Sequence, residues 1–265
     1  MDADWDTLLI ADAARADLFE ECVDHERFDK YRRVESRESA TAEWSRVNFT
    51  DDYGDTVYVT GNPATSKHIT GSFHDYIEIW QDGLDDQLGT TPADAVADAA
   101  RKAHGDYPNK RLIVHFVQSH YPLVPDDRFQ FEFWQGTDGL EFGDDTRASQ
   151  VWEAIGLGLA DPDDVWSAYR DNLEYVMDHA WDLIEDLDGK TVVHSDHGNA
   201  LGSRSWPIPV KTYGHPMGLR LSELVTVPWA VVEGERRIVR DDGANQRGHE
   251  TEEMEERLRA LGYTE

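Results

Sequence analysis

The sequence predicts an α/β fold, a three-layer sandwich in which a mainly parallel central sheet carries helices on both faces. Apolar runs of strand length, bounded by turn residues, alternate along the chain with segments of helical period. That alternation is typical of a parallel sheet, because parallel strands need helical crossovers between them. No internal repeat or low-complexity linker interrupts the pattern, so we expect residues 1–265 to form one domain.

The pattern places the elements in order along the chain. Strands are predicted at 5–11, 56–60, 111–117, from 191 onward and at 225–232, with a weaker candidate at 77–80. Helices are predicted at 13–22, 91–104, 162–187 and about 250–261. Pro92 is a favourable first residue for the second helix. Residues 126–146 show no clear period, and we expect a long surface excursion there.

Acidic residues dominate the charge and are scattered through every segment. Lys and Arg total 25 against 54 Asp and Glu, which gives a formal net charge of −29. Nucleic acids and anionic membranes are therefore not expected as partners, because phosphate contacts require clustered cations. Scattered acid also keeps a protein hydrated in concentrated salt, so we expect a halophilic source with a salt-adapted cytosol.

Cysteine content and hydropathy limit the cellular compartments that we expect for this protein. Cys22 is the only cysteine, which excludes an internal disulfide and fits a reducing compartment. No apolar window reaches the roughly 18 residues of a membrane span, and the N-terminal residues lack the positive region of a signal peptide. We therefore expect a cytoplasmic protein without membrane insertion.

The run TVVHSDHGNALG, residues 191–202, carries the first candidate site. A β-branched apolar strand stops at Asp196 and His197, and Gly198 follows. A carboxylate and an imidazole at a strand end supply oxygen and nitrogen ligands to one divalent cation. The alternative is an ordinary turn in which Asp196 caps the backbone and Gly198 provides a positive φ.

A second acid lies at the end of the first strand. Asp12 is well placed for a metal or a substrate, because ligands of open parallel sheets bind beyond the carboxyl ends of the strands. Its alternative role is to cap the following helix. Arg15 lies one turn on and could hold an anion in the same pocket, or it could form a surface ion pair with Asp17 or Glu20.

Two histidines also stand at predicted strand ends. His120 follows the strand RLIVHFV, and His215 is held between Gly214 and Pro216. His115 lies inside that strand and is expected to be a core histidine. Carboxylates and imidazoles at the ends of different strands would converge at one edge of the sheet, which predicts a site there.

These motifs together resemble the alkaline phosphatase superfamily, in its sulfatase-like and phosphoglycerol-transferase-like branch. The resemblance spans most of the chain and rests on motifs in matching order. They are DAARAD at 12–17, a hydroxyl-rich segment about 25 residues later, FVQSHYP at 116–122, SDHG at 195–198 and YGHP at 213–216.

The resemblance implies roles for these residues. Asp12, Asp196 and His197 would be metal ligands, and His120 and His215 would contact substrate or bind a second metal. Ser39 would be the catalytic nucleophile, by comparison of the following Ala-Glu-Trp with the family, and Thr41 is the second choice. In this family the reactive hydroxyl stands at a helix N-terminus, whose dipole stabilises negative charge.

The chain departs from strict sulfatases. Their nucleophile is followed by Pro or Ala at the second position and Arg at the fourth, whereas Ser39 is followed by Thr41 and Glu43. Their second consecutive Asp is replaced by Ala13. The remaining carboxylates and His197 favour Mn²⁺ or Zn²⁺ over Ca²⁺ or Mg²⁺, as one or two ions.

The sequence therefore predicts a metal-dependent hydrolase or transferase of phosphate or sulfate esters, either small molecules or glycan-linked. His120 and Arg15 would serve the catalytic step, and Arg15 and His215 would bind the anion. The alternative is a catalytically degenerate protein of the same fold that binds a metal or an anion. A nucleotide-binding fold is disfavoured, because no Gly-rich phosphate loop follows the first strand.

Overall fold

The computed structural model describes residues 3–124, 140–141, 147–148, 151–204, 206–207 and 209–245. Its strands are β1 Thr7–Ile10, β2 Lys30–Glu35, β3 Asp52–Thr60, β4 Ser72–Glu78, β5 Arg111–His115, β6 Leu140–Glu141, β7 Arg147–Ala148, β8 Thr191–His194, β9 Ala200–Arg204, β10 Lys211–Gly214 and β11 Thr226–Val232. Its helices are α1 Ala16–Cys22, the 3₁₀ turn η1 His25–Arg27, α2 Thr41–Asn48, α3 Pro63–His68, α4 Ile79–Asp82, α5 Ala93–Asp106, α6 Val151–Leu157, α7 Pro162–Asp186 and α8 Ser222–Val225.

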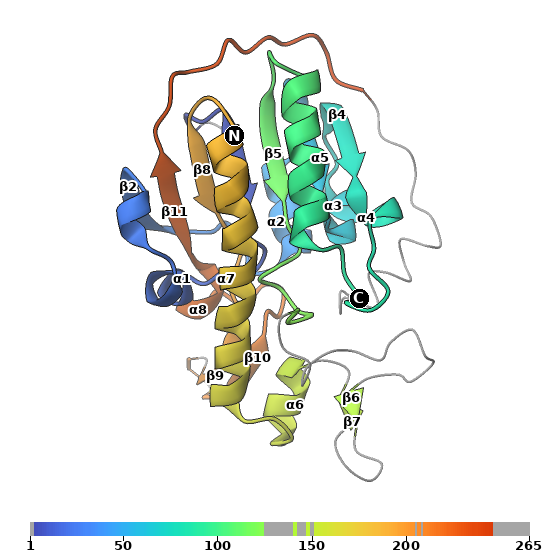
Figure 1. The fold of residues 1–265 in the computed structure, drawn as a ribbon. Coiled ribbons are helices and arrows are strands. Elements are labelled where there is room, and N and C mark those ends of the chain that lie inside the picture. The colour runs from blue at the N-terminus through green and yellow to red at the C-terminus, as the bar shows by residue number, and fades with distance from the viewer. Residues whose placement is uncertain are drawn as a thin grey trace.

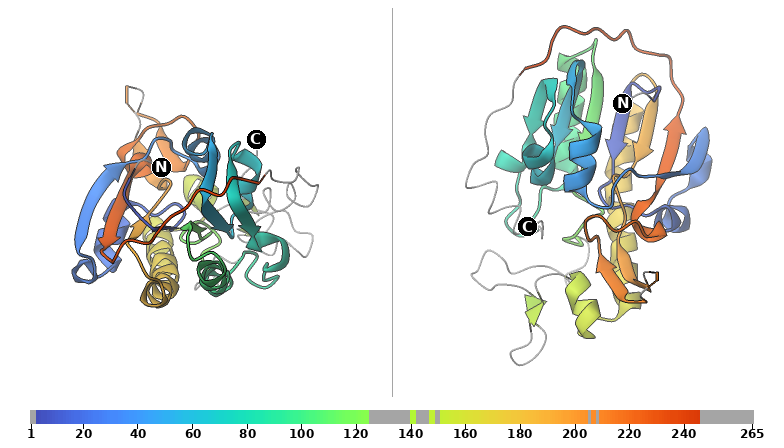
Figure 2. Two further views of the ribbon diagram at one scale, coloured as in Figure 1. Left: turned by 90° about the horizontal axis from the view of Figure 1, so that it is seen from above. Right: turned by 180° about the vertical axis from the view of Figure 1, so that it is seen from behind.

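The centre of the fold is a seven-stranded sheet in the order β2-β11-β8-β1-β5-β3-β4. Strands β8, β1, β5, β3 and β4 are parallel, whereas β11 runs antiparallel to both β8 and β2. Helices α5 and α7 cover the face seen in Figure 1, and α2 and α3 cover the opposite face (Figure 2). The predicted three-layer α/β fold with a mainly parallel sheet is confirmed.

The apolar core lies on both faces of the sheet because successive side chains of a strand point to opposite sides. In β1, Leu9 packs toward α5 and α7, whereas Leu8 and Ile10 pack into the cluster on the other face, beside Trp44 of α2. Both faces are covered, which explains why the central strands read as continuous apolar runs.

Several predicted boundaries differ from the structure for local reasons. The helix predicted from residue 13 begins at Ala16, because Ala13 adopts a left-handed φ of 59°. In the weak strand at 77–80, the second half belongs to helix α4. Edge strand β2 has no prediction, because its exposed charges hide the apolar alternation. The predictions at 126–146 and 250–261 lie largely or wholly outside the described residues.

Two segments cover the two ends of the parallel strands, here called the amino edge and the carboxyl edge of the sheet. At the amino ends of the parallel strands, the extended residues 233–245, here called the strap, run from β11 across to β4 (Figures 1 and 2). At the carboxyl ends, the β9–β10 hairpin packs against α6. Among the described residues, no helix is long and apolar enough to cross a membrane.

Candidate active site

Asp12 is held at the carboxyl edge of the sheet by the backbone around it. Its amide donates to the carbonyl of Gln118 at 3.1 Å, which ties the ends of β1 and β5 together. The side chain is fully buried. Asp12 is not a helix cap, because α1 has Arg15 at its N-cap position. The alternative role considered for Asp12 is thereby removed.

Asp196 and His197 follow β8, next to β1 in the sheet. Oδ1 of Asp196 accepts from the amides of Ala13 at 3.0 Å and His197 at 2.9 Å, so this carboxylate is fixed by the backbone of two strand ends. The left-handed turn at Ala13 aims its amide there, at a cost of about 1 kcal/mol for a residue with a Cβ.

Gly198 does not adopt the positive φ that the alternative turn would require. The structure gives a different reason for a glycine at this position. A Cβ there would lie 2.2 Å from the carbonyl oxygen of Glu223 and 2.7 Å from Cγ of Arg15. Glycine is required because the chain passes between these two groups.

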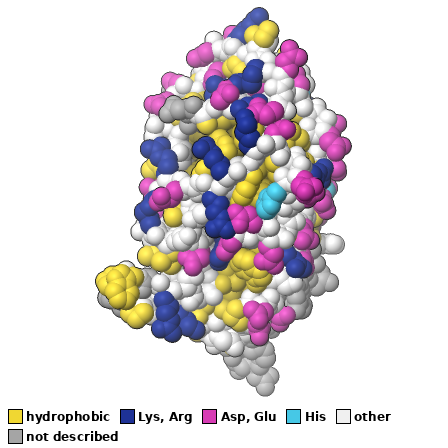
Figure 3. Space-filling model, turned by 90° about the vertical axis from the view of Figure 1, so that its left-hand side faces the viewer, with side chains coloured by type: hydrophobic (Ala, Val, Ile, Leu, Met, Phe, Trp, Pro, Cys, Tyr) yellow, Lys and Arg dark blue, Asp and Glu magenta, His cyan; other side chains and the backbone are white. Residues whose placement is uncertain are grey.

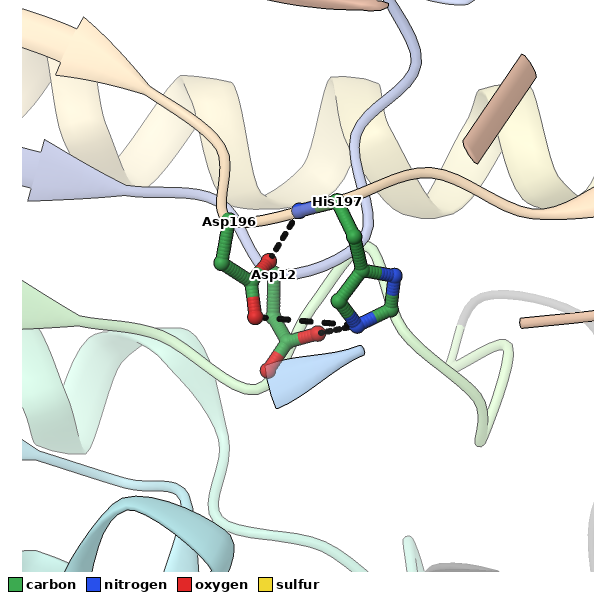
Figure 4. A group of neighbouring side chains, drawn as sticks. All are labelled: Asp12, Asp196 and His197. Carbon is green, nitrogen blue, oxygen red and sulfur yellow. Dashed lines mark hydrogen bonds and ion pairs between the residues drawn. The ribbon is translucent and has the colours of Figure 1, made fainter. Parts of the chain in front are cut away.

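Asp12, Asp196 and His197 form one buried group whose candidate ligand atoms all lie within 4.8 Å of one another (Figure 4). Nε2 of His197 is 3.6 Å from Oδ1 of Asp12 and 3.6 Å from Oδ2 of Asp196. Nδ1 of His197 lies 2.9 Å from the carbonyl oxygen of Gly198, an acceptor, so Nδ1 carries the hydrogen. In the neutral ring, Nε2 therefore presents its lone pair to the two carboxylates.

Lone pairs that face one another in a buried space repel unless a positive charge lies between them. Two carboxylate oxygens and one imidazole nitrogen are suitable ligands for Zn²⁺ or Mn²⁺. The donor set of the described residues thus fits a divalent cation.

Thr41 is the hydroxyl that faces this group. Its Oγ1 donates to Oδ2 of Asp196 at 2.7 Å and lies 3.1 Å from Nε2 of His197 and 3.4 Å from Asp12. Thr41 is the first residue of α2, whose N-cap is Ala40, so neither hydroxyl of the segment caps the helix. The sequence comparison preferred Ser39, but Oγ of Ser39 instead donates to the carbonyl of Pro216 at 3.0 Å.

Asn62 and His115 orient Asp12, and the sequence reasoning missed both roles. Nδ2 of Asn62 donates to Oδ2 of Asp12, while its Oδ1 caps α3 by accepting from the Ala64 amide at 2.8 Å. Nε2 of His115 lies 3.3 Å from the same carboxylate, and its Nδ1 lies 2.8 Å from the Tyr58 hydroxyl. Asn62 directly follows β3, so the rule that pointed to Asp12 could have found it.

The surroundings of Asp12 determine its charge. Burial raises the pKa of this carboxyl, but the contact with His115 and the neighbouring imidazoles outweigh burial and hold the pKa well below its usual range. Asp12 is therefore an anion at neutral pH, as a metal ligand must be.

His120 and His215 complete a cluster of three imidazoles with His197. The ring of His215 lies 4.6 Å from that of His197 and 4.9 Å from that of His120. Burial lowers the pKa of His120 and takes that of His215 well below its usual value. Nδ1 of His120 donates to the Tyr121 carbonyl at 2.7 Å, so its Nε2 bears the lone pair of the neutral ring.

The contacts of Arg15 differ from the predicted role of this residue, which was to bind an anion in the site. Its guanidinium is paired with Asp17 and donates to the carbonyl of Asn199 at 2.9 Å, and it lies over the ring of Trp166. Of the two alternatives, the structure shows the ion pair with Asp17. Arg15 supports the loop after His197 from the side and is not part of the group around Thr41.

Comparison with solved structures finds the same fold in bacterial phosphoethanolamine transferases. The integral membrane protein lipooligosaccharide phosphoethanolamine transferase A from Neisseria meningitidis aligns with a TM-score of 0.55 at 13% identity over 86% of this chain and 47% of its own. The periplasmic domain of EptC from Campylobacter jejuni gives a TM-score of 0.51 at 16% identity, with 85% and 78% of the two chains covered. This chain thus spans about half the length of the first of these proteins.

A third structure is the periplasmic domain of EcEptC from Escherichia coli in complex with zinc. It has a TM-score of 0.50 and 12% identity, over 87% of this chain and 72% of its own. No protein-family model matches the sequence, and a search of curated proteins finds no match. The similarity therefore establishes a fold that this chain shares with phosphoethanolamine transferases. The candidate metal group of Asp12, Asp196 and His197 rests on the structure of this chain itself.

Proposed function

We propose that this protein is a metal-dependent enzyme that hydrolyses or transfers phosphate esters, with Thr41 as its nucleophile. One observation carries the proposal: the Thr41 hydroxyl lies within hydrogen-bond distance of both Asp196 and His197, inside the buried group formed with Asp12. A hydroxyl alone is a weak nucleophile, and it requires a metal or a base beside it.

Asp12, Asp196 and His197 would hold the divalent cation. When bound, such an ion lowers the pKa of a neighbouring hydroxyl and offsets the charge of a phosphate ester. Oδ2 of Asp196 accepts the hydrogen of the Thr41 hydroxyl. The lone pairs of Thr41 Oγ1 therefore point away from Asp196. The N-terminus of α2 adds a partial positive charge beside the same oxygen.

His120 and His215 would contact the ester. Both rings are largely neutral at pH 7 because burial lowers their pKa values. Nδ1 of His120 donates to the Tyr121 carbonyl and Nδ1 of His215 donates to Oδ1 of Asn199 at 2.8 Å, so the Nε2 lone pair of each ring would take up a proton during the reaction or bind a second metal ion. His215 is only half-buried, whereas His120 is almost fully buried. The ester therefore approaches from the side of His215.

A phosphate ester is preferred to a sulfate ester as the substrate class. The solved structures that share the fold are phosphoethanolamine transferases, and the sequence after Ser39 lacks the pattern of aldehyde-forming sulfatases. The carboxylate and imidazole donors support Zn²⁺ or Mn²⁺, and one of the structures with the same fold is a zinc complex.

The test is turnover by the Zn²⁺- or Mn²⁺-loaded protein of p-nitrophenyl phosphate, its phosphodiester and p-nitrophenyl sulfate. We expect turnover of at least one phosphate ester, a loss of about a thousandfold or more in Thr41→Ala, and a residual rate in Thr41→Ser. Ser39→Ala is the matched control and should stay within about tenfold of the parent.

Intact-mass spectrometry of the stalled reaction should also find a phosphoester adduct that Thr41→Ala lacks. Bound metal without turnover of any ester would instead identify a degenerate binding protein. A larger loss in Ser39→Ala than in Thr41→Ala would return the nucleophile to Ser39.

A further inference from the structure

The segment that contains His197, the β9–β10 hairpin and His215 has an unusual charge. Residues 197–222 contain no Asp or Glu, although 54 of the 265 residues in the chain are acidic. At that density, a stretch of 26 residues would hold about five acids. The same segment carries Arg204, Lys211 and Arg220, so it is a locally basic part of a strongly acidic chain.

The structure places exposed apolar side chains in the middle of this segment, at the turn of the β9–β10 hairpin. Trp206 is 88% exposed and Val210 is 60% exposed, between β9 and β10. Arg204 and Lys211 pair directly across the two strands, immediately behind them. We call Arg204, Trp206, Pro207, Pro209, Val210 and Lys211 the hairpin tip.

Other exposed apolar residues gather near the hairpin. The large hydrophobic side chains exposed among the described residues are Leu157, Trp206, Val210, Met217 and Ile238. Met217 lies two residues after His215, and Leu157 ends α6, which packs on β9 and β10. Only Ile238 lies elsewhere, on the strap at the opposite edge of the sheet.

The shape of the hairpin tip favours one class of partner over another. In Figure 3 hydrophobic side chains stand out as a knob at the lower left, where the β9–β10 hairpin lies, with basic side chains nearby. A projecting knob fits a medium that deforms around it, whereas a protein partner would need a pocket of matching shape.

We propose that the hairpin tip docks on the surface of a lipid bilayer with anionic headgroups. Tryptophan is favoured at the membrane–water interface, where its ring is buried and its N–H remains hydrated. Arg204 and Lys211 are placed to meet the anionic headgroups, each contributing about 1 kcal/mol near such a surface. The acidic surface farther away is screened beyond about 8 Å at physiological ionic strength.

Docking at this point would fix the orientation of the candidate site. Val210 and His215 are five residues apart, so their Cα atoms are separated by at most about 18 Å. The carboxyl edge of the sheet would then face the bilayer, and the strap would face away. This inference goes beyond the proposed chemistry and runs against the expectation, drawn from the acid excess and the lack of clustered cations in the sequence, that anionic membranes are not partners.

Flotation with vesicles tests the docking. The full chain should bind vesicles that mix phosphatidylglycerol with phosphatidylcholine, and bind phosphatidylcholine alone more weakly. Trp206→Ser should weaken binding at least about tenfold, because burying a tryptophan removes a large apolar area from water. Ile238→Ser, which removes a side chain that is 72% exposed on the strap, is the matched control and should bind like the parent.

Charge variants test the cationic part of the proposal. Lys211→Gln should weaken binding to the anionic vesicles about fivefold. Lys102→Gln makes the same change in net charge on α5 and should leave binding unaltered. Circular dichroism and the midpoint of thermal unfolding should be unchanged in Trp206→Ser, which confirms that the variant folds.

The docking and the proposed chemistry can fail separately. Thr41→Ala should bind vesicles like the parent, and Trp206→Ser should turn over a soluble ester at the parental rate. The docking proposal is overturned if the parent ignores both vesicle types or if Trp206→Ser binds as well as Ile238→Ser. A change from dimer to monomer in Trp206→Ser by light scattering, without vesicle binding, would identify a second copy as the occupant.

Discussion

The two edges of the central sheet bury polar groups in opposite ways. At the amino edge, Nζ of buried Lys110 donates to the carbonyls of Gly54 and Arg240 and to Asp242, at 2.8 to 2.9 Å. At the carboxyl edge, Asp12 and Asp196 face the lone pair of His197 and the Thr41 hydroxyl. At the amino edge the chain supplies the cation itself, whereas at the carboxyl edge the described residues place no Lys or Arg side chain within the group of Asp12, Asp196 and His197.

That difference separates stability from function in this fold. Lys110 bonds to Arg240 and Asp242 of the strap, and Arg237 of the strap bonds to His104 and forms an ion pair with Asp188, so these contacts hold the strap across the strand ends. The group around Thr41 spends stability on buried like charges, which is typical of a site prepared for a ligand.

Removing a carboxylate at the carboxyl edge should have the largest effect. Asp196→Asn should lower ester turnover by about a thousandfold or more, because a bound metal supplies several kcal/mol of charge stabilisation. Zn²⁺ or Mn²⁺ in hundredfold excess over its dissociation constant should raise the unfolding midpoint of the parent by roughly 5 to 10 °C. The variant should lose this rise.

Turnover assays and calorimetry with and without chelator measure both effects. Asp178→Asn, a change of the same charge on the exposed side of α7, should behave like the parent. An equal metal-induced rise in Asp196→Asn would contradict the assignment of the site.

Breaking the amino edge should cost stability instead of activity. Lys110→Met should lower the free energy of unfolding by about 2 to 4 kcal/mol, because the hydrogen bonds of a buried cation are lost and its acceptors are left without it. Denaturant unfolding measures the loss. Turnover per folded molecule should be unchanged, since the strap lies far from Thr41, and Lys102→Met on the surface of α5 should have little effect.

A loss of turnover in folded Lys110→Met as large as that in Asp196→Asn would argue that the two edges are coupled. In that case the strap would belong to the functional machinery.

Asn62 should have an intermediate effect as a positioning residue. Asn62→Ser can still cap α3 but loses the amide that donates to Asp12, so turnover should fall about 10- to 100-fold with little loss of stability. A metal titration should show weaker binding, which a purely structural role would leave unchanged. Thr65→Ser, a neighbouring change within α3, serves as the control.

The smallest predicted effect is a pH dependence at the amino edge. Burial lowers the pKa of His104, and the adjacent Arg237, whose NH1 donates to Nδ1 of His104 at 3.0 Å, lowers it further. The unfolded chain therefore takes up this proton at a higher pH, near the ordinary value of about 6.5. Stability from His104 is present above that pH and is lost as the pH falls through it toward the folded pKa.

After allowance for solvent screening, the loss should be a few tenths of a kcal/mol. Urea unfolding between neutral and mildly acidic pH measures it. His104→Gln should give a flatter profile. Identical slopes in the parent and His104→Gln would remove His104 as the cause.

Much of the candidate site could be predicted from the sequence because strand ends are local signals. Asp12, Asp196 and His120 each follow an apolar run, and parallel strands bring their carboxyl ends to one edge. Asn62 also follows a strand of this sheet, but in the sequence the Gly-Asn-Pro run at 61–63 was interpreted only as a turn. His115 was correctly expected to be buried in its strand, but its contact with Asp12 depends on the pairing of β1 with β5.

The choice between the two hydroxyls shows where sequence reasoning stops. Ser39 and Thr41 are two residues apart, and both match a hydroxyl-rich segment before a helix. Ala40 is extended and α2 begins at Thr41, so the two side chains leave the backbone in different surroundings. One bonds to Pro216 and the other to Asp196, from segments more than 150 residues away.

The sequence by itself determined the α/β class, the strand-end acids and imidazoles and the acid-free stretch around the hairpin, because strand periodicity and charge are properties of neighbouring residues. Only the tertiary structure decided that Thr41 faces the acid–imidazole group, that Arg15 turns to Asp17 and that Trp206 projects from the surface. The physical reason is that the direction of a side chain depends on local dihedral angles and on packing against distant segments.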